Sequence, residues 1–130
     1  MIVDTSALLA IIFAEPQFEV YARAISDSAS CRISAVSFVE LSIVAESRAG
    51  DAGVRQCEVL LHESGISIEP LTEQQANLAR RAYSEYGKGR HAAGLNFGDC
   101  FSYALARYSG EPLLFKGDDF SKTDVKSAIP

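Results

Sequence analysis

The sequence predicts a single α/β domain built on a mostly parallel sheet. Its 130 residues are enough for one hydrophobic core, and a composition of 48% hydrophobic and 22% charged residues is that of a globular protein, not of a disordered or coiled-coil chain. Short apolar segments alternate with longer segments of helical pattern, which requires crossover connections and therefore parallel strands. We expect residues 1–130 to form one domain, because no linker, internal repeat or low-complexity tract interrupts them.

The first half of the chain predicts two strands and four helices. Ile2 and Val3 form a continuous apolar pair typical of a buried strand, and the capping residues that follow open a helix ending near Glu15-Pro16. The next predicted elements are a helix over roughly Gln17–Ser28, a strand over Cys31–Ser34, and helices over Ala35–Arg48 and Asp51–Ser64, separated by Ala49-Gly50.

The second half predicts two strands, two helices and a loop. Ile66–Ile68 is a short strand, and Thr72-Glu73-Gln74-Gln75 has the capping-box pattern that opens a helix. That helix is expected to end at Gly87 and to bury Ala76, Ala79, Tyr83 and Tyr86. The remaining elements are a loop over Lys88–Leu95, a helix over Phe97–Tyr108 capped by Asn96, and a strand over Leu113–Phe115. The apolar stripe of the last helix is Phe97, Cys100, Phe101, Ala104, Leu105 and Tyr108.

Several classes of protein are excluded by composition. The longest apolar run, Ala7–Ala14, is too short to span a bilayer and lacks the flanks of a secretory signal. Three dispersed cysteines without a CxxC pair indicate neither a disulfide framework nor a thiolate metal site, so we expect buried free cysteines in a cytoplasmic protein without a membrane segment. A net charge of -5 argues against a general nucleic-acid coat protein.

Two acidic positions follow predicted strands. Asp4 comes directly after the first strand, where it can also be a simple N-cap, and Asp118 and Asp119 follow the last strand and a glycine turn, where solvated turn acids are common. Ligands of parallel sheets collect beyond the carboxyl ends of the strands. The two positions are therefore candidates for one binding site.

Two further acids lie on predicted helices. Glu40 falls within an apolar stripe formed by Val36, Val39, Ile43 and Val44, and a carboxylate on a buried face needs a partner or a cation. Apolar residues on the other sides of this helix leave the buried face open, so a solvent-facing Glu40 is the alternative. Asp99 is the third residue after the Asn96 cap, where the helix N-terminus favours an anion, and it points away from the apolar stripe.

Convergence of these acids predicts a metal site. Two carboxylates about 4 Å apart repel by about 4 kcal/mol at an effective dielectric constant near 20. Three or four converging acids therefore stay ionised only with a divalent cation among them. Oxygen ligands without a Cys or His cluster favour Mg²⁺ or Mn²⁺ over zinc.

Four blocks of the sequence resemble a known family. Met1-Ile-Val-Asp4-Thr5-Ser6-Ala-Leu, Ser37-Phe-Val-Glu40-Leu, Leu95-Asn96-Phe97-Gly98-Asp99-Cys100 and Leu113-Leu-Phe-Lys-Gly-Asp-Asp119-Phe120 resemble PIN-domain ribonucleases, above all the VapC toxins of bacterial VapBC type II toxin–antitoxin modules. The likeness runs from Met1 to about Val125, in order and at similar spacing. The resemblance implies the PIN-like three-layer fold, with a mostly parallel central sheet flanked by helices.

The resemblance also implies roles for individual residues. Asp4 and Asp99 match direct metal ligands, and Glu40 matches a further ligand or an acid behind the ligands. The role of the fourth acid passes to Asp119, with Asp118 as its substitute. Thr5 or Ser6 resembles the small hydroxyl residue that helps to orient the catalytic site.

The function implied is that of a toxin that cleaves RNA. The resemblance suggests a Mg²⁺- or Mn²⁺-dependent endoribonuclease that forms a homodimer and a heteromeric complex with a VapB-type antitoxin. Phe38, Leu41 and Tyr103 are candidate contacts for such partners. A basic rim for RNA is expected from the loop Lys88–His91 with Arg80, Arg81 and Lys116, and His62 and His91 are expected at the surface.

Three other functions are alternatives to that of an RNA-cleaving toxin. A receiver domain needs an acid pair after the first strand and a lone Asp near residue 69, where Glu69-Pro70 stands. A haloacid-dehalogenase-type phosphatase needs Asp-x-Asp, and Asp4-Thr5-Ser6 lacks the second acid. The remaining alternative is a catalytically silent PIN-like module that binds RNA or a protein.

Overall fold

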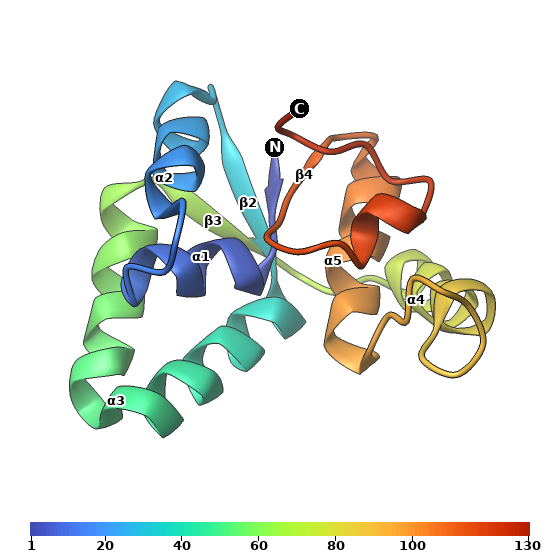
Figure 1. Cartoon of the computed structure of the whole chain (residues 1–130), viewed down its shortest axis with the longest axis horizontal. Helices are drawn as coiled ribbons and strands as arrows, with labels where there is room; N and C mark the ends of the chain where they lie inside the picture. Colours follow the sequence, from blue (N-terminus) through green and yellow to red (C-terminus); the bar gives the residue numbers. More distant parts are fainter.

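Four parallel strands form the centre of the structure, a computed structural model that describes residues 1–130 (Figure 1). The elements in chain order are β1 (Ile2–Val3), α1 (Thr5–Ile12), α2 (Phe18–Asp27), β2 (Cys31–Ser34), α3 (Ala35–Glu63), β3 (Ile66–Glu69), α4 (Glu73–Tyr86), α5 (Phe97–Ser109), β4 (Leu113–Leu114) and a 3₁₀ turn, η1 (Phe120–Lys122). The predicted order of strands and helices is confirmed, with boundaries within a few residues.

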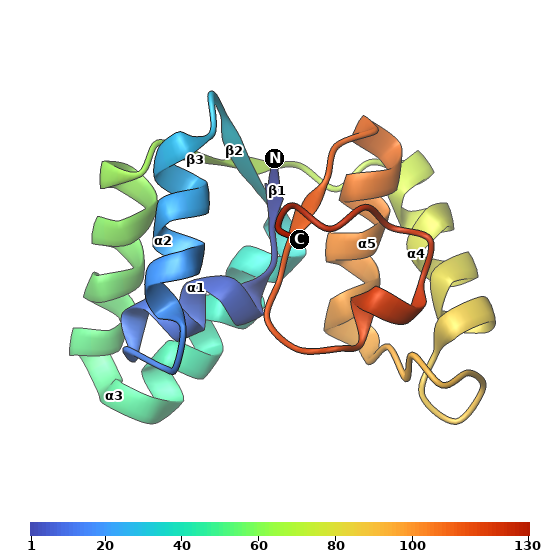
Figure 2. The ribbon, with the colours of Figure 1, turned by 45° about the horizontal axis from the view of Figure 1, so that its top comes forward.

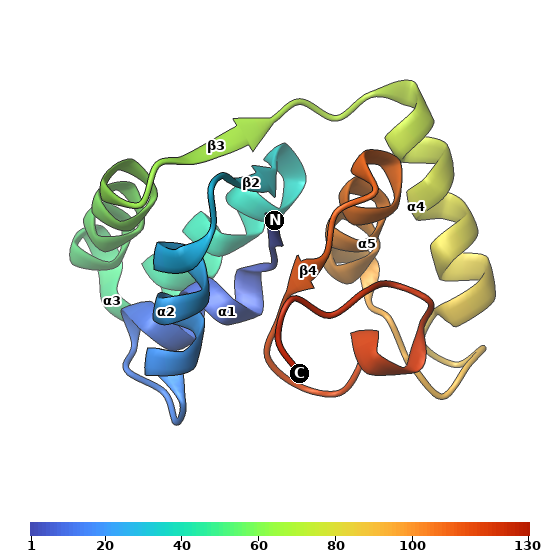
Figure 3. The same cartoon turned by 90° about the horizontal axis from the view of Figure 1, so that it is seen from above.

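The sheet has the strand order β3-β2-β1-β4. Ile2 pairs with Arg32 of β2 on one side and with Leu113 of β4 on the other, so β1 is an inner strand. Helices α1, α2 and α3 cover one face of the sheet, and α4 and α5 cover the other, as Figures 2 and 3 show. This is the expected α/β fold with three layers.

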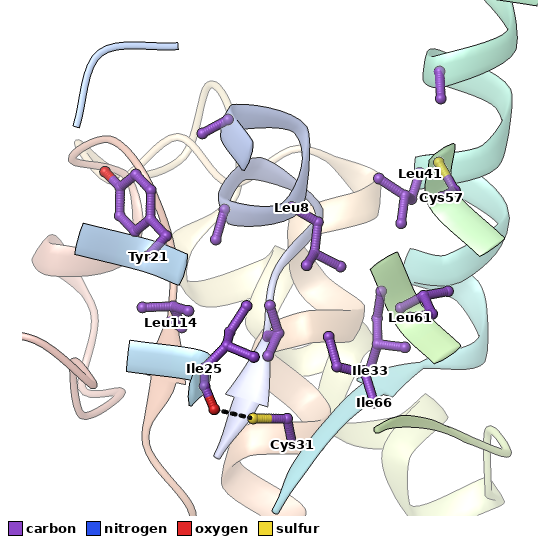
Figure 4. Packing of buried hydrophobic residues seen from close by; sticks show 14 residues of the cluster. Leu8, Tyr21, Ile25, Cys31, Ile33, Leu41, Cys57, Leu61, Ile66 and Leu114 are labelled. Atoms are coloured by element: carbon purple, nitrogen blue, oxygen red, sulfur yellow. Dashed lines mark hydrogen bonds between the residues drawn. The ribbon is translucent and has the colours of Figure 1, made fainter. Parts of the chain in front are cut away.

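Each face of the sheet has its own hydrophobic core. Val3 and Leu114 point toward α1–α3, where they pack with Leu8, Ile33 and Leu41 (Figure 4). The adjacent residues of the same strands, Ile2 and Leu113, point toward α4 and α5. Strands buried on both faces carry continuous apolar residues, which is why two residues suffice to recognise β1.

Helix α3 bends at Gly50, where the two predicted helices were expected to meet. Gly50 has φ 60° and ψ -146°, a conformation that a side chain disfavours. The bend lets the second half of α3 return along the core, so that Cys57 and Leu61 are buried beside Ile66 of β3.

The structure decides which face of α3 is buried, a question that the sequence left open: the stripe that contains Val39 and Ile43 lies at the surface. Val39 is 52% exposed and Ile43 61% exposed, whereas Ser37, Leu41 and Ala45 face the core. Helix α3 has apolar residues on both sides, and the side that packs against α1 is the one that carries Leu41. The surface stripe borders Glu40, which is half-buried.

The predicted buried faces of α4 and α5 are partly wrong. In α4, Ala76 and Tyr83 are exposed, and the buried side chains are Gln75, Ala79 and Ala82, since small residues let α4 approach α5 closely. In α5, Cys100, Ala104 and Leu105 are buried as predicted, but Phe97 is 73% exposed and Tyr108 is exposed at the far end.

Two of the expected partner contacts are buried instead. Leu41 is fully buried in the core on one face of the sheet, and Tyr103 is buried on the other, where its hydroxyl donates to Asp124 Oδ1 at 2.6 Å. Neither side chain is exposed at the surface, so neither is available for contact with a partner protein. Phe38 is half-buried and packs against the core.

The cysteines agree with the compositional prediction. Cys31, Cys57 and Cys100 are free and buried. None of the helices is both long enough and apolar enough to cross a membrane.

Candidate active site

Asp4 lies at the carboxyl edge of the sheet, at the point where the order in which the chain adds strands reverses from one side of β1 to the other. The chain runs from β1 outward to β2 and β3, and then returns to place β4 on the other side of β1. Asp4 follows β1 directly, donates its backbone N–H to Leu114 O at 2.9 Å and caps the N-terminus of α1. Such switch points are where ligands of parallel sheets bind.

Three hydrogen bonds hold the Asp4 carboxylate, which is 3% exposed. Oδ2 accepts the backbone N–H of Ser6 at 3.0 Å and the Ser6 hydroxyl at 2.6 Å, while Oδ1 accepts the Ser102 hydroxyl at 2.5 Å. Ser6 Oγ accepts in turn the backbone N–H of Lys116 at 3.0 Å. The capping role of Asp4 thus coexists with a fixed orientation of its carboxylate.

Glu40 reaches the same region from α3. Its carboxylate lies directly over the Cα of Gly98 on α5, because a Cβ built on Gly98 would overlap Oε2 and come within 2.7 Å of Cδ. Burial raises the pKa of Glu40, the Thr5 hydroxyl lowers it, and the negative charge of Asp4 raises it further. Glu40 is therefore close to both Asp4 and Asp99.

Asp99 combines a structural role with an unusual charge environment. Its Oδ2 accepts the Asn96 backbone N–H at 3.0 Å, and Asn96 Oδ1 accepts the Asp99 backbone N–H at 2.8 Å, which completes a capping box. Burial raises the pKa of Asp99 to about 7; the Asn96 hydrogen bond opposes this rise, and the charges of Asp4, Asp119 and Glu40 add to it. Three acids from other elements thus act on one carboxyl group.

The two acids after β4 differ in their surroundings. Asp119 begins η1 and its charge acts on Asp99, whereas Asp118 is absent from the charges that raise the pKa of Asp99. The backbone carbonyl of Asp118 accepts hydrogen bonds from Ser121, which shape the turn. Both side chains are exposed.

The donor set fits a hard divalent cation in its chemistry. All the candidate ligands are carboxylate oxygens, and the glycine at position 98 leaves room for the Glu40 carboxylate beside the helix that carries Asp99. No three His, Cys, Asp or Glu side chains stand within ligating distance of a common point. Carboxylates repel one another, and a cation between them would have to draw them together.

Three residues of the site were missed by sequence reasoning: Ser37, Gly98 and Ser102. Ser102 and Ser37 are fully buried and hydrogen-bonded to each other at 3.0 Å, and Ser102 donates to Asp4. The available signal was a polar residue between Phe101 and Tyr103 on a helix that is otherwise apolar at these positions. For Gly98 the signal was a glycine inside the first turn of a helix.

The basic residues expected to form a rim are all at least partly exposed. Lys88 and Arg90 lie on the loop that leads into Asn96, and Lys116 follows β4, where its Nζ donates to Glu15 Oε1 at 2.8 Å. His62 and His91 are exposed, as predicted. His91 Nδ1 accepts the backbone N–H of Ala93 at 3.0 Å and thereby closes the loop.

Comparison with known proteins gives concordant matches. The PIN domain family matches residues 1–126. A Ribonuclease VapC of Mycolicibacterium smegmatis is 50% identical over 125 residues, which cover 96% of this chain and 97% of that protein. Ribonuclease VapC30 of Mycobacterium tuberculosis is 46% identical over 131 residues and the full length of both chains. The crystal structure of Mycobacterium tuberculosis VapC20, described as a sarcin-ricin loop cleaving toxin, has a TM-score of 0.78 at 17% identity and covers 95% of each chain.

Proposed function

Because the chain belongs to the PIN domain family, and within it to the VapC ribonucleases, we propose that it is an endoribonuclease toxin whose active site is the group of acids around Asp4. The reaction is hydrolysis of RNA phosphodiester bonds. A protein that only binds RNA or a partner is not favoured, because all the acids that the resemblance implies are present near one edge of the sheet.

One observation supports the site above all others. The pKa of Asp99 is raised to about 7 by burial and by the charges of Asp4, Asp119 and Glu40, which come from three other segments of the chain. Bringing like charges together destabilises the fold, and a cation offsets that repulsion. Perturbed carboxyl groups that gather at a switch point are typical of functional sites.

The metal ion in this proposal is Mg²⁺ or Mn²⁺, held by Asp4, Asp99, Glu40 and Asp119. When bound, such an ion activates a water for attack and neutralises charge on the phosphate and the leaving oxygen. Asp4 is held in one orientation by Ser6 and Ser102. Asp99 uses Oδ2 for the capping box, and its Oδ1 accepts no hydrogen bond, so Oδ1 is the oxygen that would bind the ion.

The protein supplies no covalent nucleophile to this reaction. Cys100 is the cysteine next to Asp99, and burial together with the Asp99 charge raises the pKa of its thiol to about 11. A buried thiol of this kind is inert as a nucleophile at neutral pH. Attack by water is therefore the proposed route, and Lys88, Arg90 and Lys116 attract the phosphates of a substrate to an otherwise acidic protein.

The proposed partners are a VapB-type antitoxin and a second copy of the chain in the cytoplasm. Their support is an apolar surface beside Glu40: an open hollow of about 550 Å³ is lined mainly by Val39, Ile43 and Phe97 with their neighbours. These three side chains are 52%, 61% and 73% exposed. Exposed apolar groups that adjoin one another commonly mark protein contacts.

The test is RNA cleavage by the purified protein with Mg²⁺, with Mn²⁺ and with chelator. We expect cleavage only with a divalent cation, and its loss in Asp4→Asn and Asp99→Asn variants whose melting curves match that of the wild type. Cleavage that persists in chelator, or at the wild-type rate in both variants, contradicts the proposal. Antitoxin binding is tested separately, by inhibition of cleavage on addition of the antitoxin encoded beside the toxin.

A further inference from the structure

We infer that Ser102 is a positioning residue that leaves Asp4 a single free lone pair, on Oδ1, for the catalytic cation. This inference rests on the proposed function and adds a residue to it. Ser102 lies on α5, 98 residues away from Asp4 in sequence, and is fully buried. Its hydroxyl donates to Asp4 Oδ1 at 2.5 Å.

The lone pairs of Asp4 can be counted. A carboxylate has about four acceptor sites, two on each oxygen. Both sites of Oδ2 are taken, one by the Ser6 backbone N–H and one by the Ser6 hydroxyl. Ser102 takes one site of Oδ1, so the other site of Oδ1 is the only one left. Asp4 is thereby limited to binding a cation through one oxygen and from one direction.

A second buried serine fixes the direction of the Ser102 hydroxyl. Ser37 on α3 is fully buried, and its Oγ lies 3.0 Å from Ser102 Oγ. Ser102 has a single hydroxyl proton, which it gives to Asp4, so Ser37 is the donor in the serine pair. The Ser37 carbonyl accepts the Thr5 hydroxyl at 3.1 Å, which joins α3 to the start of α1.

The serine pair also connects the helices that carry two other acids. Ser37 precedes Glu40 by three residues on α3, and Ser102 follows Asp99 by three residues on α5. Residues three apart share a helix face. Each serine therefore lies about one helical turn from an acid on the same side of its helix. The bond between the two serines ties together the two helices that present Glu40 and Asp99, and Ser102 extends that tie to Asp4.

The competing interpretation is that the two serines merely satisfy one another in the interior. Buried hydroxyl groups need hydrogen-bond partners whatever their function. The two interpretations differ in one respect: a purely structural Ser102 affects stability alone, whereas a positioning residue affects the affinity for the cation. Removal of an outer partner of a metal ligand typically weakens metal binding by about 10- to 100-fold.

The experiment measures Mn²⁺ binding directly, by the loss of the free-ion signal in electron paramagnetic resonance, and records melting curves for each protein. We expect Ser102→Ala to weaken Mn²⁺ binding by about 10- to 100-fold. Ser37→Ala keeps the bond between Ser102 and Asp4 and has to show a smaller loss. Ser109→Ala is the matched control, since it removes a hydroxyl from the same helix that donates only to the backbone carbonyls of Leu105 and Ala106; its Mn²⁺ affinity has to equal that of the wild type.

Each outcome separates the inference from the proposed function. If the wild type binds Mn²⁺ and Ser102→Ala binds it equally well, the inference is wrong and the proposed function stands. If the wild type binds no Mn²⁺, both are overturned. If Ser102→Ala does not fold, the variant Ser37→Ala/Ser102→Ala, which leaves no serine unpaired, has to show the same weakened binding. A positioning role further requires that excess Mn²⁺ restores much of the lost cleavage rate.

Discussion

Gly98→Ala is expected to inactivate the enzyme without unfolding it. The new Cβ would overlap Glu40 Oε2 and lie 2.7 Å from Cδ and 2.9 Å from Oε1, whereas ordinary contact begins at 3.4 Å. Moving Cδ from 2.7 Å to 3.4 Å requires a shift of about 0.7 Å, and Oε2 has to move further. Misplacement of a reacting group by about 1 Å costs roughly 100-fold in rate, which is the loss in kcat/KM that we expect.

The stability of the Gly98→Ala variant is expected to rise slightly or to stay the same, although its cleavage rate falls. The atoms that collide are the end of a flexible side chain, so Glu40 is able to move aside. Alanine is favoured over glycine inside a helix by about 0.5–1 kcal/mol. The melting temperature of Gly98→Ala is therefore expected to equal or exceed that of the wild type, while RNA cleavage in the presence of Mn²⁺ falls.

Two further variants decide whether the effect passes through Glu40. Gly53→Ala is the control, because its Cβ would collide with the Ala45 backbone carbonyl, far from the acids; we expect lower stability and normal cleavage per folded molecule. In the double variant Gly98→Ala/Glu40→Ala the two losses should not add, because they share one cause. Wild-type cleavage by Gly98→Ala, or additive losses, would refute the reasoning.

Three more predictions concern the acids. Asp119→Asn should lower the cleavage rate by about 100-fold or more, as expected for a lost ligand. Asp118→Asn should cleave RNA within a few-fold of the wild-type rate. Equal effects of the two variants in a plate-reader cleavage assay would reject Asp119 as the fourth acid. Folding raises the pKa of Asp99 from 3.8 to about 7. In chelator, the free energy of unfolding should therefore fall as the pH rises between these values, and it should level off above them. Urea melts of Asp99→Asn should show a flatter pH profile. Mn²⁺ at about 100 times its Kd should stabilise the wild type by about 2.7 kcal/mol, and differential scanning calorimetry should find no such gain in Asp99→Asn.

The elements of the fold were predictable because their signals are local. The Asp4 and Asn96 caps and the apolar pair Ile2–Val3 depend only on adjacent residues, and all three were interpreted correctly. The interruption at Gly50 was also predicted, as a boundary between two helices, since glycine allows a backbone conformation that other residues avoid.

The buried faces of the helices were less predictable because they depend on distant partners. Helix α3 is apolar on two sides, and only the packing of α1 decides that Leu41 is buried and that Val39 is exposed. Phe97 belongs to the apolar stripe of α5, but it is the first residue of that helix and is 73% exposed. The periodicity of apolar residues identifies an apolar side of a helix, but it does not show which element packs against that side.

The acids of the candidate site could be proposed from the sequence, but the residues that hold them in place could not. Asp4 was singled out because it follows a strand, Asp99 because it lies at a helix N-terminus, and Glu40 because a carboxylate within an apolar stripe is unusual. Ser37 and Ser102 were not, since serine is common in helices and their bond joins positions 65 residues apart. Hydrogen bonds between distant elements leave no periodic trace in a sequence.

Because β1 pairs with β4, Asp4 cannot take its place in the site until the last strand of the sheet has been added. Asp4 donates its backbone N–H to Leu114 O, and Asp119 comes five residues after that carbonyl. A ribosome therefore has to release almost the entire chain from its exit tunnel before these carboxylates face one another. Protein synthesis itself delays the nuclease activity, and we expect truncated products that end ahead of β4 to be harmless to the cell that makes them.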